Sequence, residues 1–239
     1  MANFVVNNTG SMVKFMEIYL LPSVHILSSN PAHVRRAFEI ARPDCIAVEL
    51  CMSRFMSINS NKKPGLGQML ANPLLTALFF LQQSLGAVIG AKPGAEMMEG
   101  AKIAREAGMP LLLADVPIEA TINNISKSPL REKIALLLPQ STKTGVDLSQ
   151  LESLANPDAL TGALEAFEKS APILYSALIS SRDSHMLGSV MASGGRRVLL
   201  IVGAGHAPGI IRLINSANSN SSRQITYKIL EYAALSSKP

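Results

Sequence analysis

Four short apolar runs constrain the fold of this 239-residue chain more than any other feature. They cover residues 15–21, 45–50, 111–114 and 198–202. Their apolar residues are nearly continuous rather than alternating, which is typical of parallel strands covered on both faces. Glycine and proline signals between the runs predict helices over 31–41, 94–108 and 172–192. We therefore expect an α/β fold with a mostly parallel central sheet flanked by helices.

The rest of the chain fits a single domain that spans residues 1–239. Between residues 118 and 170 no apolar run predicts a strand, so we expect a helical insertion there. An Asn- and Ser-rich stretch, 215–222, predicts a flexible loop before a last strand over 224–232. Hydrophobic residues make up 48% of the chain and charged residues 16%, which is enough apolar surface for a sizeable core.

Charge and cysteine content limit the partners and the compartment. The net charge of +5 comes without a Lys/Arg run or a basic stripe, so we expect no nucleic-acid partner. Cys45 and Cys51 lie roughly 20 Å apart along one predicted strand, at ~3.3 Å per residue, which is too far for a disulfide. Two free thiols and the lack of a secretory signal in the N-terminal residues predict a cytoplasmic protein.

Residues 69–90 carry no charged side chain and are about numerous enough to cross a bilayer. Gln82, Gln83 and Ser84 lie in the middle of this segment, and such polar groups are costly to expose to lipid. We therefore predict a buried or dimer-interface helix rather than a transmembrane helix, and a homodimer as the assembly. Peripheral membrane contact through 69–90 is the alternative.

Each of the four runs ends on, or leads into, a residue capable of acid–base or metal chemistry. These residues are His25, Glu49, Asp115 and His206. Ligands bind at the carboxyl ends of the strands in parallel α/β sheets, so we expect the four side chains to converge there. Two imidazoles and two carboxylates can hold a divalent cation or form an acid–base cluster.

Each of these residues also has a structural alternative. Glu49 could form a structural ion pair, although a buried carboxylate without a partner or a cation is costly. Either histidine taken alone would more often be a structural side chain. Asp115 could simply cap the helix that begins near Ile118.

The predicted helix 172–192 adds two charged residues. Arg182 lies within an apolar face of this helix, and Asp183 borders that face. Charges in an apolar stripe need partners. Arg182 could pair with Glu49, orient an anionic substrate group, or form a structural salt bridge under the sheet. His33 and His185 are predicted to lie on solvated helix surfaces.

The run VLLIVGAGHAPGI is a strand followed by Gly203, Gly205 and Gly209, which is superficially similar to a dinucleotide-binding turn. However, the spacing G-x-G-x-x-x-G is wider than that fingerprint, and His206 and Pro208 occupy the turn itself. We favour a turn whose glycines let the backbone curl so that His206 faces the strand ends.

Four motif blocks, in this order, resemble the TraB family, the group of TraB, PrgY and GumN proteins related to the TIKI proteases. The blocks are VHILSSNPAHVRRAFEIARPDCIAVELCMSRF, KPGAEMMEGAKIAREAGMPLLLADVPIEATI, SSRDSHM and VGAGHAPGI. The resemblance covers about residues 18–213. Its candidate site residues within the blocks are His25, Glu49, Arg54, Glu96, Asp115, Arg182, Asp183, Gly203, Gly205 and His206.

The resemblance implies a fold like that of the erythromycin esterase/ChaN superfamily and a metal-dependent hydrolase that acts on peptides. It implies that His25, Glu49 and His206 hold a divalent ion (Mn, Co or Zn) or activate water. Glu96 would be a further ligand or base, and Arg182 would stabilise developing negative charge. TraB and PrgY proteins are associated with the shutdown of peptide pheromones, so we expect a peptide or small-molecule substrate.

Three functions are open at this point. The first is the metal-dependent hydrolase. The second is a non-catalytic peptide- or ligand-binding protein on the same fold, because Pro22 stands where the family's first histidine turn carries glycine, and Pro lacks a backbone N–H. The third is a dinucleotide-binding enzyme, which only the glycine turn favours.

Overall fold

The computed structural model describes residues 5–6, 12–13, 15–23, 30–59, 94–137, 157–220, 224–231 and 235. Its main sheet has five strands, all parallel, in the order β5-β4-β6-β3-β7. The strands are β3 (Phe15–Ser23), β4 (Cys45–Val48), β5 (Leu111–Leu113), β6 (Arg197–Gly203) and β7 (Gln224–Ile229). Strands β1 (Val5–Val6) and β2 (Met12–Val13) form a separate antiparallel pair. The predicted α/β fold and its five strands are confirmed.

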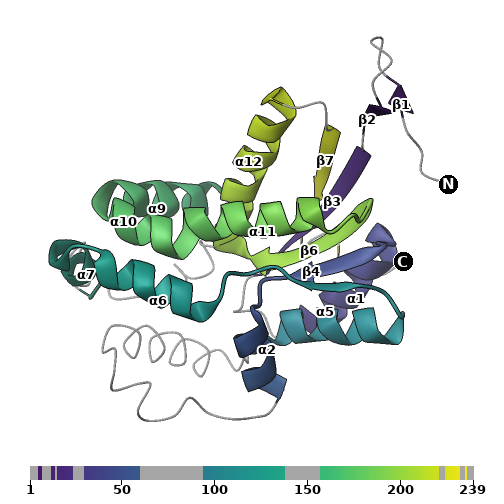
Figure 1. The fold of residues 1–239 in the computed structure, drawn as a ribbon, viewed down its shortest axis with the longest axis horizontal. Coiled ribbons are helices and arrows are strands. Elements are labelled where there is room, and N and C mark those ends of the chain that lie inside the picture. Colours follow the sequence, from purple (N-terminus) through teal and green to yellow (C-terminus); the bar gives the residue numbers. More distant parts are fainter. Residues whose placement is uncertain are drawn as a thin grey trace.

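Helices cover both faces of this sheet, as Figure 1 shows. Helices α1 (Asn30–Ala41) and α5 (Ala95–Glu106) pack on one face, and α11 (Ser181–Ala192) and α12 (Ala207–Asn220) pack on the other. Right-handed crossovers explain this division. From β3 through β4 to β5 the chain moves one way across the sheet, and from β5 through β6 to β7 it moves back.

The reversal of direction makes the carboxyl end of β6 a switch point. Strand β6 lies between β4 and β3, which lead to helices on one face, whereas β6 itself leads to α12 on the other face. Such switch points are where ligands bind in open parallel sheets. Two short elements follow the strands here, namely α2 (Met52–Asn59) after β4 and the 3₁₀ turn η2 (Ala204–His206) after β6.

The strand residues alternate between two apolar clusters. Ile18 and Leu20 face α11 and α12, whereas Tyr19 and Leu21 face α1 and α5. Both sets are buried, so the runs are continuous in the sequence, as expected for parallel strands covered on both faces. Helix α5 approaches the sheet closely at Gly100, where an added Cβ would lie 2.6 Å from Ile201 Cδ1.

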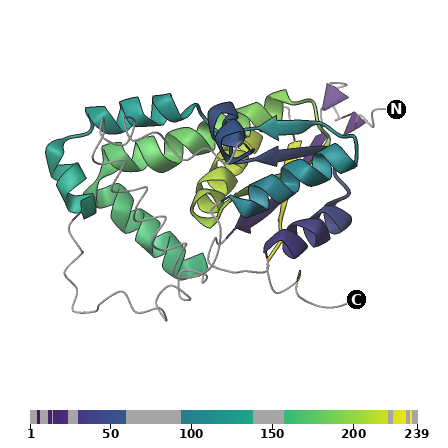
Figure 2. The ribbon, with the colours of Figure 1, turned by 90° about the horizontal axis from the view of Figure 1, so that it is seen from below.

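The predicted helical insertion forms an extension to one side of the sheet (Figures 1 and 2). Its described helices are α6 (Ile118–Lys127), α7 (Leu130–Leu137) and α9 (Pro157–Ser170), and α10 (Pro172–Tyr175) follows directly after them. Within the described residues of 118–170 there is no strand, so the helical character predicted for that part is confirmed. Residues 138–156 lie outside the described part of the chain.

The helix predicted over 172–192 is confirmed, and it contains a π-helical turn, η1 (Ser176–Ser180), between α10 and α11. The flexible loop predicted over 215–222 is wrong as far as Asn220, because α12 continues to that residue. Asn218 accounts for the longer helix: its Oδ1 accepts from Ile225 N at 2.8 Å and its Nδ2 donates to Ile225 O at 2.7 Å, which ties the helix to β7.

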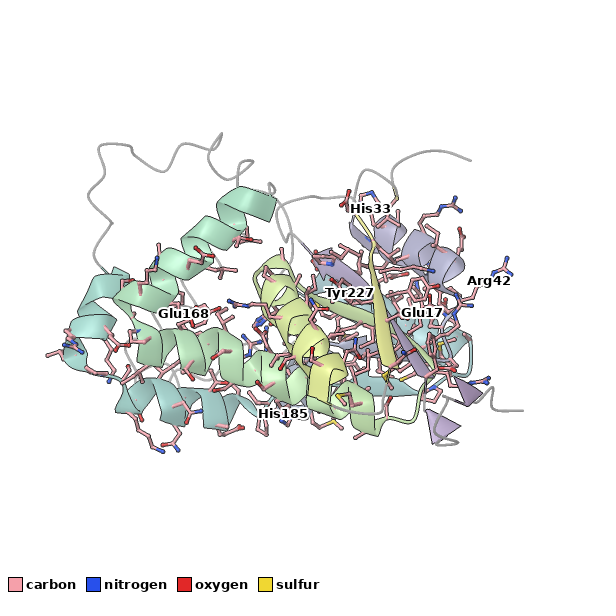
Figure 3. The ribbon with its side chains drawn as sticks, turned by 90° about the horizontal axis from the view of Figure 1, so that it is seen from above. Glu17, His33, Arg42, Glu168, His185 and Tyr227 are labelled. Atoms are coloured by element: carbon pink, nitrogen blue, oxygen red, sulfur yellow. The ribbon has the colours of Figure 1, made fainter. Side chains whose placement is uncertain are left out.

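Several predictions on single residues and segments have separate outcomes. Cys45 and Cys51 are both free, as expected, and both are buried. His185 is exposed on α11, but His33, labelled with it in Figure 3, is buried in α1, and burial lowers its pKa.

None of the helices in the described ranges is both long and apolar enough to span a bilayer. The uncharged segment 69–90 lies outside those ranges.

Candidate functional site

The carboxyl ends of β4 and β6 bring together residues that are far apart in the sequence. Glu49 directly follows β4, where its backbone N–H donates to Ile201 O at 3.0 Å and continues the pairing with β6. His206 ends the turn η2 after β6. Arg182 and Asp183 come from the first turn of α11, on the same face of the sheet as α12. Glu49, Asp183 and His206 are buried.

Glu49 lies at the centre of this group. Its Oε2 accepts a hydrogen bond from Gly203 N at 2.7 Å, and its Oε1 accepts one from Nη2 of Arg182. Oε1 also lies 3.1 Å from His206 Nε2. Burial alone would raise the pKa of Glu49, but His206, Arg182 and the Gly203 N–H outweigh burial and hold the pKa well below its usual range. Glu49 is therefore a buried, fixed carboxylate anion.

His206 bridges two carboxylates. Its Nδ1 lies 2.6 Å from Asp183 Oδ1, and its Nε2 faces Glu49. Burial opposes the charged imidazolium, but Glu49 and Asp183 together raise the pKa of His206 to about 9. At neutral pH the ring is therefore protonated, and both of its N–H groups donate to carboxylates.

Asp183 is held against the backbone of α12. An added Cβ at Gly209 would lie 2.9 Å from Asp183 Cγ and closer still to Oδ2, so the carboxylate occupies the space that a side chain would fill. Burial raises the pKa of Asp183 despite the opposing effect of His206 and Arg182. Gly209 is thus a glycine because of this close approach, which the sequence pattern alone did not indicate.

Arg182 joins Glu49 to a third carboxylate. Its Nε donates to Asp115 Oδ1 at 2.9 Å and its Nη2 to Oδ2 at 2.8 Å, a two-bond fork, while Nη1 donates to Leu178 O at 3.1 Å. Burial opposes the charge of Arg182, but Glu49 and Asp115 raise its pKa above the ordinary value. Of the alternatives for Arg182, the structure contains the pairing with Glu49.

The capping alternative for Asp115 is wrong. Helix α6 begins after Pro117 and has no side-chain cap. Instead, Asp115 Oδ1 accepts from Val116 N at 2.9 Å and both oxygens bind Arg182. Asp115 is therefore a fixed member of the group, held by the turn that follows β5.

Two predicted site residues lie at the margin of this group. Arg54, on α2, has Nη1 3.8 Å from Asp115 Oδ2, and its side chain is 36% exposed. Gly205 lies in the turn η2, and a Cβ added there would meet nothing within 4 Å. The turn backbone at Gly205 is thus open.

Glu96 lies on α5, which packs on the opposite face of the sheet from α11 and α12. It is buried in the first turn of α5, one helical turn before Gly100, which faces Ile46, Val48 and Ile201. Residues four apart share a helix face, so Glu96 lies on the face of α5 that packs on β4 and β6.

His25 lies outside the described residues, so its place in the site stays a prediction. The strand before it is described: Pro22 stays within β3 in register with Val202, and Ser23 pairs with Gly203. Pro22 therefore does not end the strand, and the chain leaves β3 beside the turn that carries His206.

Nε2 of His206 and Oε1 of Glu49 are candidate ligand atoms for a divalent ion. Two ligands that each lie ~2.1 Å from one ion are themselves ~3.0–3.4 Å apart at the usual angles, and Nε2 of His206 and Oε1 of Glu49 are 3.1 Å apart. A carboxylate on the other ring nitrogen, here Asp183, is the usual support of a metal-binding histidine. Within the described ranges, no group of three or more His, Cys, Asp or Glu side chains is arranged to hold a metal ion. The separation of His206 Nε2 and Glu49 Oε1 is by itself compatible with two ligands of one ion.

Asp44, which belongs to the first motif block, has a structural role away from the site. Asp44 accepts hydrogen bonds from Arg196 N and Arg197 N at 3.0 and 3.1 Å, at the amino end of β6. Asp44 directly precedes β4 and Glu49 directly follows it, so the two carboxylates lie at opposite ends of this strand. The motif thus combines a structural carboxylate with a site carboxylate five residues later.

Comparison with known proteins gives two matches. The model of the TraB/PrgY/gumN family matches residues 11–220, close to the span of the motif blocks. An uncharacterized protein of Methanocaldococcus jannaschii is 26% identical over an alignment of 221 residues, which covers 86% of this chain and 55% of the relative. The chain thus spans little more than half the length of that relative.

Proposed function

Because this chain belongs to the TraB/PrgY/gumN family, and because its switch point carries a buried Glu49–His206 pair, we propose that it is a metal-dependent hydrolase that acts on peptides. The observation that carries the proposal is the 3.1 Å approach of His206 Nε2 to Glu49 Oε1, with Asp183 on Nδ1. Asp183 binds Nδ1 of His206, so the ring is oriented with Nε2 toward Glu49, where the proposed ion would bind.

In this proposal His206 and Glu49 hold the divalent ion (Mn, Co or Zn), and His25 is the third ligand. When bound, the ion would polarise the substrate carbonyl and lower the pKa of a water molecule. Glu96 is proposed as the general base, because it is a buried carboxylate on the face of α5 that packs on β4 and β6, and a carboxylate can accept a proton from a reacting water.

The chain's other residues would fix the ligands. Asp183 holds the ring of His206 through Nδ1, and the Gly203 N–H holds Oε2 of Glu49. Arg182 donates to Glu49 and Asp115 at once, so it sets the orientation of Glu49 and balances its charge. Three of its nitrogens already donate within the protein, which favours a positioning role over direct contact with the substrate.

The experiment is metal content and peptide hydrolysis in matched histidine variants. We expect about one equivalent of Mn, Co or Zn in the loaded protein, and loss of both metal and hydrolysis in His206→Ala. His185→Ala is the control, because His185 is exposed on the same helix as Asp183. His206 must release its Nε2 proton to bind a metal, so uptake near pH 7 should release about one proton per ion. Unchanged metal binding in both His206→Ala and Glu49→Gln would refute the proposal.

A non-catalytic ligand-binding protein is the second candidate, favoured by one observation. Both oxygens of Glu49 already accept hydrogen bonds, from Arg182 and Gly203, so the carboxylate is satisfied without a metal ion. On this alternative, a pool of short peptides binds without turnover in the presence of each metal, and binding survives Glu49→Gln. Turnover that Glu49→Gln abolishes would reject it.

A further inference from the structure

Among the described residues, Arg54 uses fewer of its N–H donors than Arg182, the other arginine beside Glu49 and Asp115. Its single ion pair among the described residues is the 3.8 Å contact with Asp115, which is longer than a hydrogen bond. A guanidinium has five N–H donors in a flat fork. In contrast, Nε, Nη1 and Nη2 of Arg182 all donate within the protein.

Asp115 does not need Arg54. Both oxygens of Asp115 accept from Arg182, and Oδ1 also accepts from Val116 N. The side chain of Arg54 is 36% exposed, whereas that of Asp115 is 4% exposed, so their contact lies where the buried group meets solvent. A long, partly exposed ion pair of this kind contributes little to stability.

The position of Arg54 relates it to the proposed reaction centre. Asp115 and Arg182 link it to Glu49 through contacts that are each under 4 Å. An extended peptide advances ~3.3–3.6 Å per residue, so two or three residues suffice to reach from Arg54 to Glu49. Helix α2, which carries Arg54, starts three residues after Glu49, so the same segment fixes both.

We propose that Arg54 binds a carboxylate of the substrate, so that the site takes short peptides with a free C-terminal carboxylate two or three residues from the reacting bond. A guanidinium binds a carboxylate through two parallel N–H bonds, and the 3.8 Å contact of Nη1 with Asp115 keeps Arg54 beside the site. The proposal rests on the proposed function, from which it takes the peptide as substrate class.

The test compares two probes that differ only at the C-terminus, N-acetyl-trialanine as the free acid and as the amide. Their dissociation constants are measured by calorimetry with the full chain, for wild type, Arg54→Gln and Arg105→Gln. Arg105 is exposed in the last turn of α5 and controls for the loss of one positive charge. We expect the acid to bind about tenfold more tightly than the amide in wild type and in Arg105→Gln, and equally in Arg54→Gln.

The melting temperature separates recognition from folding. Arg54→Gln should melt within about 2 °C of wild type, because the Asp115 contact is long and partly exposed. Arg54→Lys should keep part of the preference for the acid, since it keeps the charge but loses the fork.

Three results would overturn the assignment: an acid preference that survives in Arg54→Gln, equal binding of acid and amide in wild type, or no binding of the acid at millimolar concentration. Tighter binding of inorganic phosphate than of the acid, lost in Arg54→Gln, would instead assign the site to phosphate. None of these measurements involves turnover, so the assignment can fail while the hydrolase proposal stands.

Discussion

At the level of single residues, the site is a chain of alternating charges. Asp183, His206, Glu49, Arg182 and Asp115 contact one another in that order. Each buried charge is costly alone, and each is stabilised by oppositely charged neighbours or by backbone N–H groups. The residue types can be read from the sequence, but the order of the chain depends on which side chains meet in space.

Gly209 provides the first prediction at this level. In Gly209→Ala the new Cβ would overlap Asp183, so the carboxylate must leave His206. We expect a loss of about 2–4 kcal/mol in the free energy of unfolding, from overpacking and from a broken buried pair. Urea unfolding measures it. Gly188→Ala is the control, because Gly188 lies within α11 with nothing within 4 Å of an added Cβ, and it should stabilise by about 0.5–1 kcal/mol. Equal effects of the two substitutions would contradict this account.

The charge of His206 predicts how stability depends on pH. The pKa of His206 is raised to about 9 in the folded chain against 6.5 when unperturbed, so its contribution is fully present below pH 6.5 and is lost as pH rises through 9. The pKa of Glu49 is lowered, so its contribution is present above 4.5 and is lost as pH falls further. The joint contribution of His206 and Glu49 to the free energy of unfolding should thus be highest between about pH 4.5 and 6.5, and it should decline by roughly 3 kcal/mol above pH 9.

Urea unfolding of histidine variants from pH 5 to 10 checks this dependence. His206→Gln should flatten the decline between pH 7 and 10, because the titrating ring is gone. His185→Gln should keep the wild-type profile, since His185 is exposed. A wild-type profile without a decline above pH 7 would show that His206 does not carry the raised pKa.

At the level of helices and strands, helix ends and turns set the positions of the site residues. Arg182 and Asp183 lie two and three residues after the end of the π-helical turn η1, and the carbonyl of Leu178 within that turn accepts a hydrogen bond from Arg182. π-helical turns are often found at functional sites. The sequence predicts one continuous helix here, because its apolar pattern does not distinguish a π turn from an α turn.

The start of the helix before this turn depends on Glu132. Helix α10 begins with Ala171 as its N-cap, which offers no side-chain cap, and Pro172 follows. Glu132 of α7 supplies the missing acceptor, since its Oε2 accepts from Ile173 N at 3.0 Å and Leu174 N at 2.9 Å. A carboxylate at a helix N-terminus is also favoured by the helix dipole.

We therefore predict that Glu132→Ala lowers the free energy of unfolding by about 2–3 kcal/mol, because it leaves buried N–H groups without an acceptor. Glu132→Gln should cost about half as much, since an amide oxygen still accepts. Glu168→Ala is the control on the neighbouring helix α9, where Glu168 is exposed (Figure 3), and it should change stability by less than about 0.5 kcal/mol. Urea unfolding measures all three, and equal losses for Glu132→Ala and Glu168→Ala would rule out the capping role.

At the level of the whole molecule, the order of the strands decides where the site lies. The chain turns toward one face after β3 and β4 and toward the other face after β6, so the carboxyl ends of these strands form the switch point. Glu49, Gly203 and His206 all lie there. Neither the strand order nor the face of each helix can be taken from the apolar runs, although right-handed crossovers explain both once the order is known.

A homodimer formed through segment 69–90 is a prediction at this level, because the segment has no charged side chain. The segment lies outside the described residues. Sedimentation at micromolar concentration should give a dimer, and Phe79→Glu in this segment should shift it to a monomer. Met52→Glu is the control, because Met52 is exposed on α2. A monomer in the wild-type chain would contradict the dimer, and flotation of the chain with liposomes would favour membrane contact instead.

The amino-acid sequence alone was enough to predict the parallel sheet, its five strands and the place of Glu49, Asp115 and His206 after strand ends, because burial on both faces leaves continuous apolar runs and sites follow strands. It also indicated that Arg182 needs an acidic partner, since a charge in an apolar stripe must be compensated. It misjudged His33 and the end of α12, and it left open whether Asp115 caps a helix, because the contacts that decide these points form only in the folded chain. Three contacts became known only from the folded chain: Asp183 pairs with His206, Gly209 makes room for Asp183, and Gly203 donates to Glu49. They could not be predicted, since they form only when α11, α12 and β6 pack together.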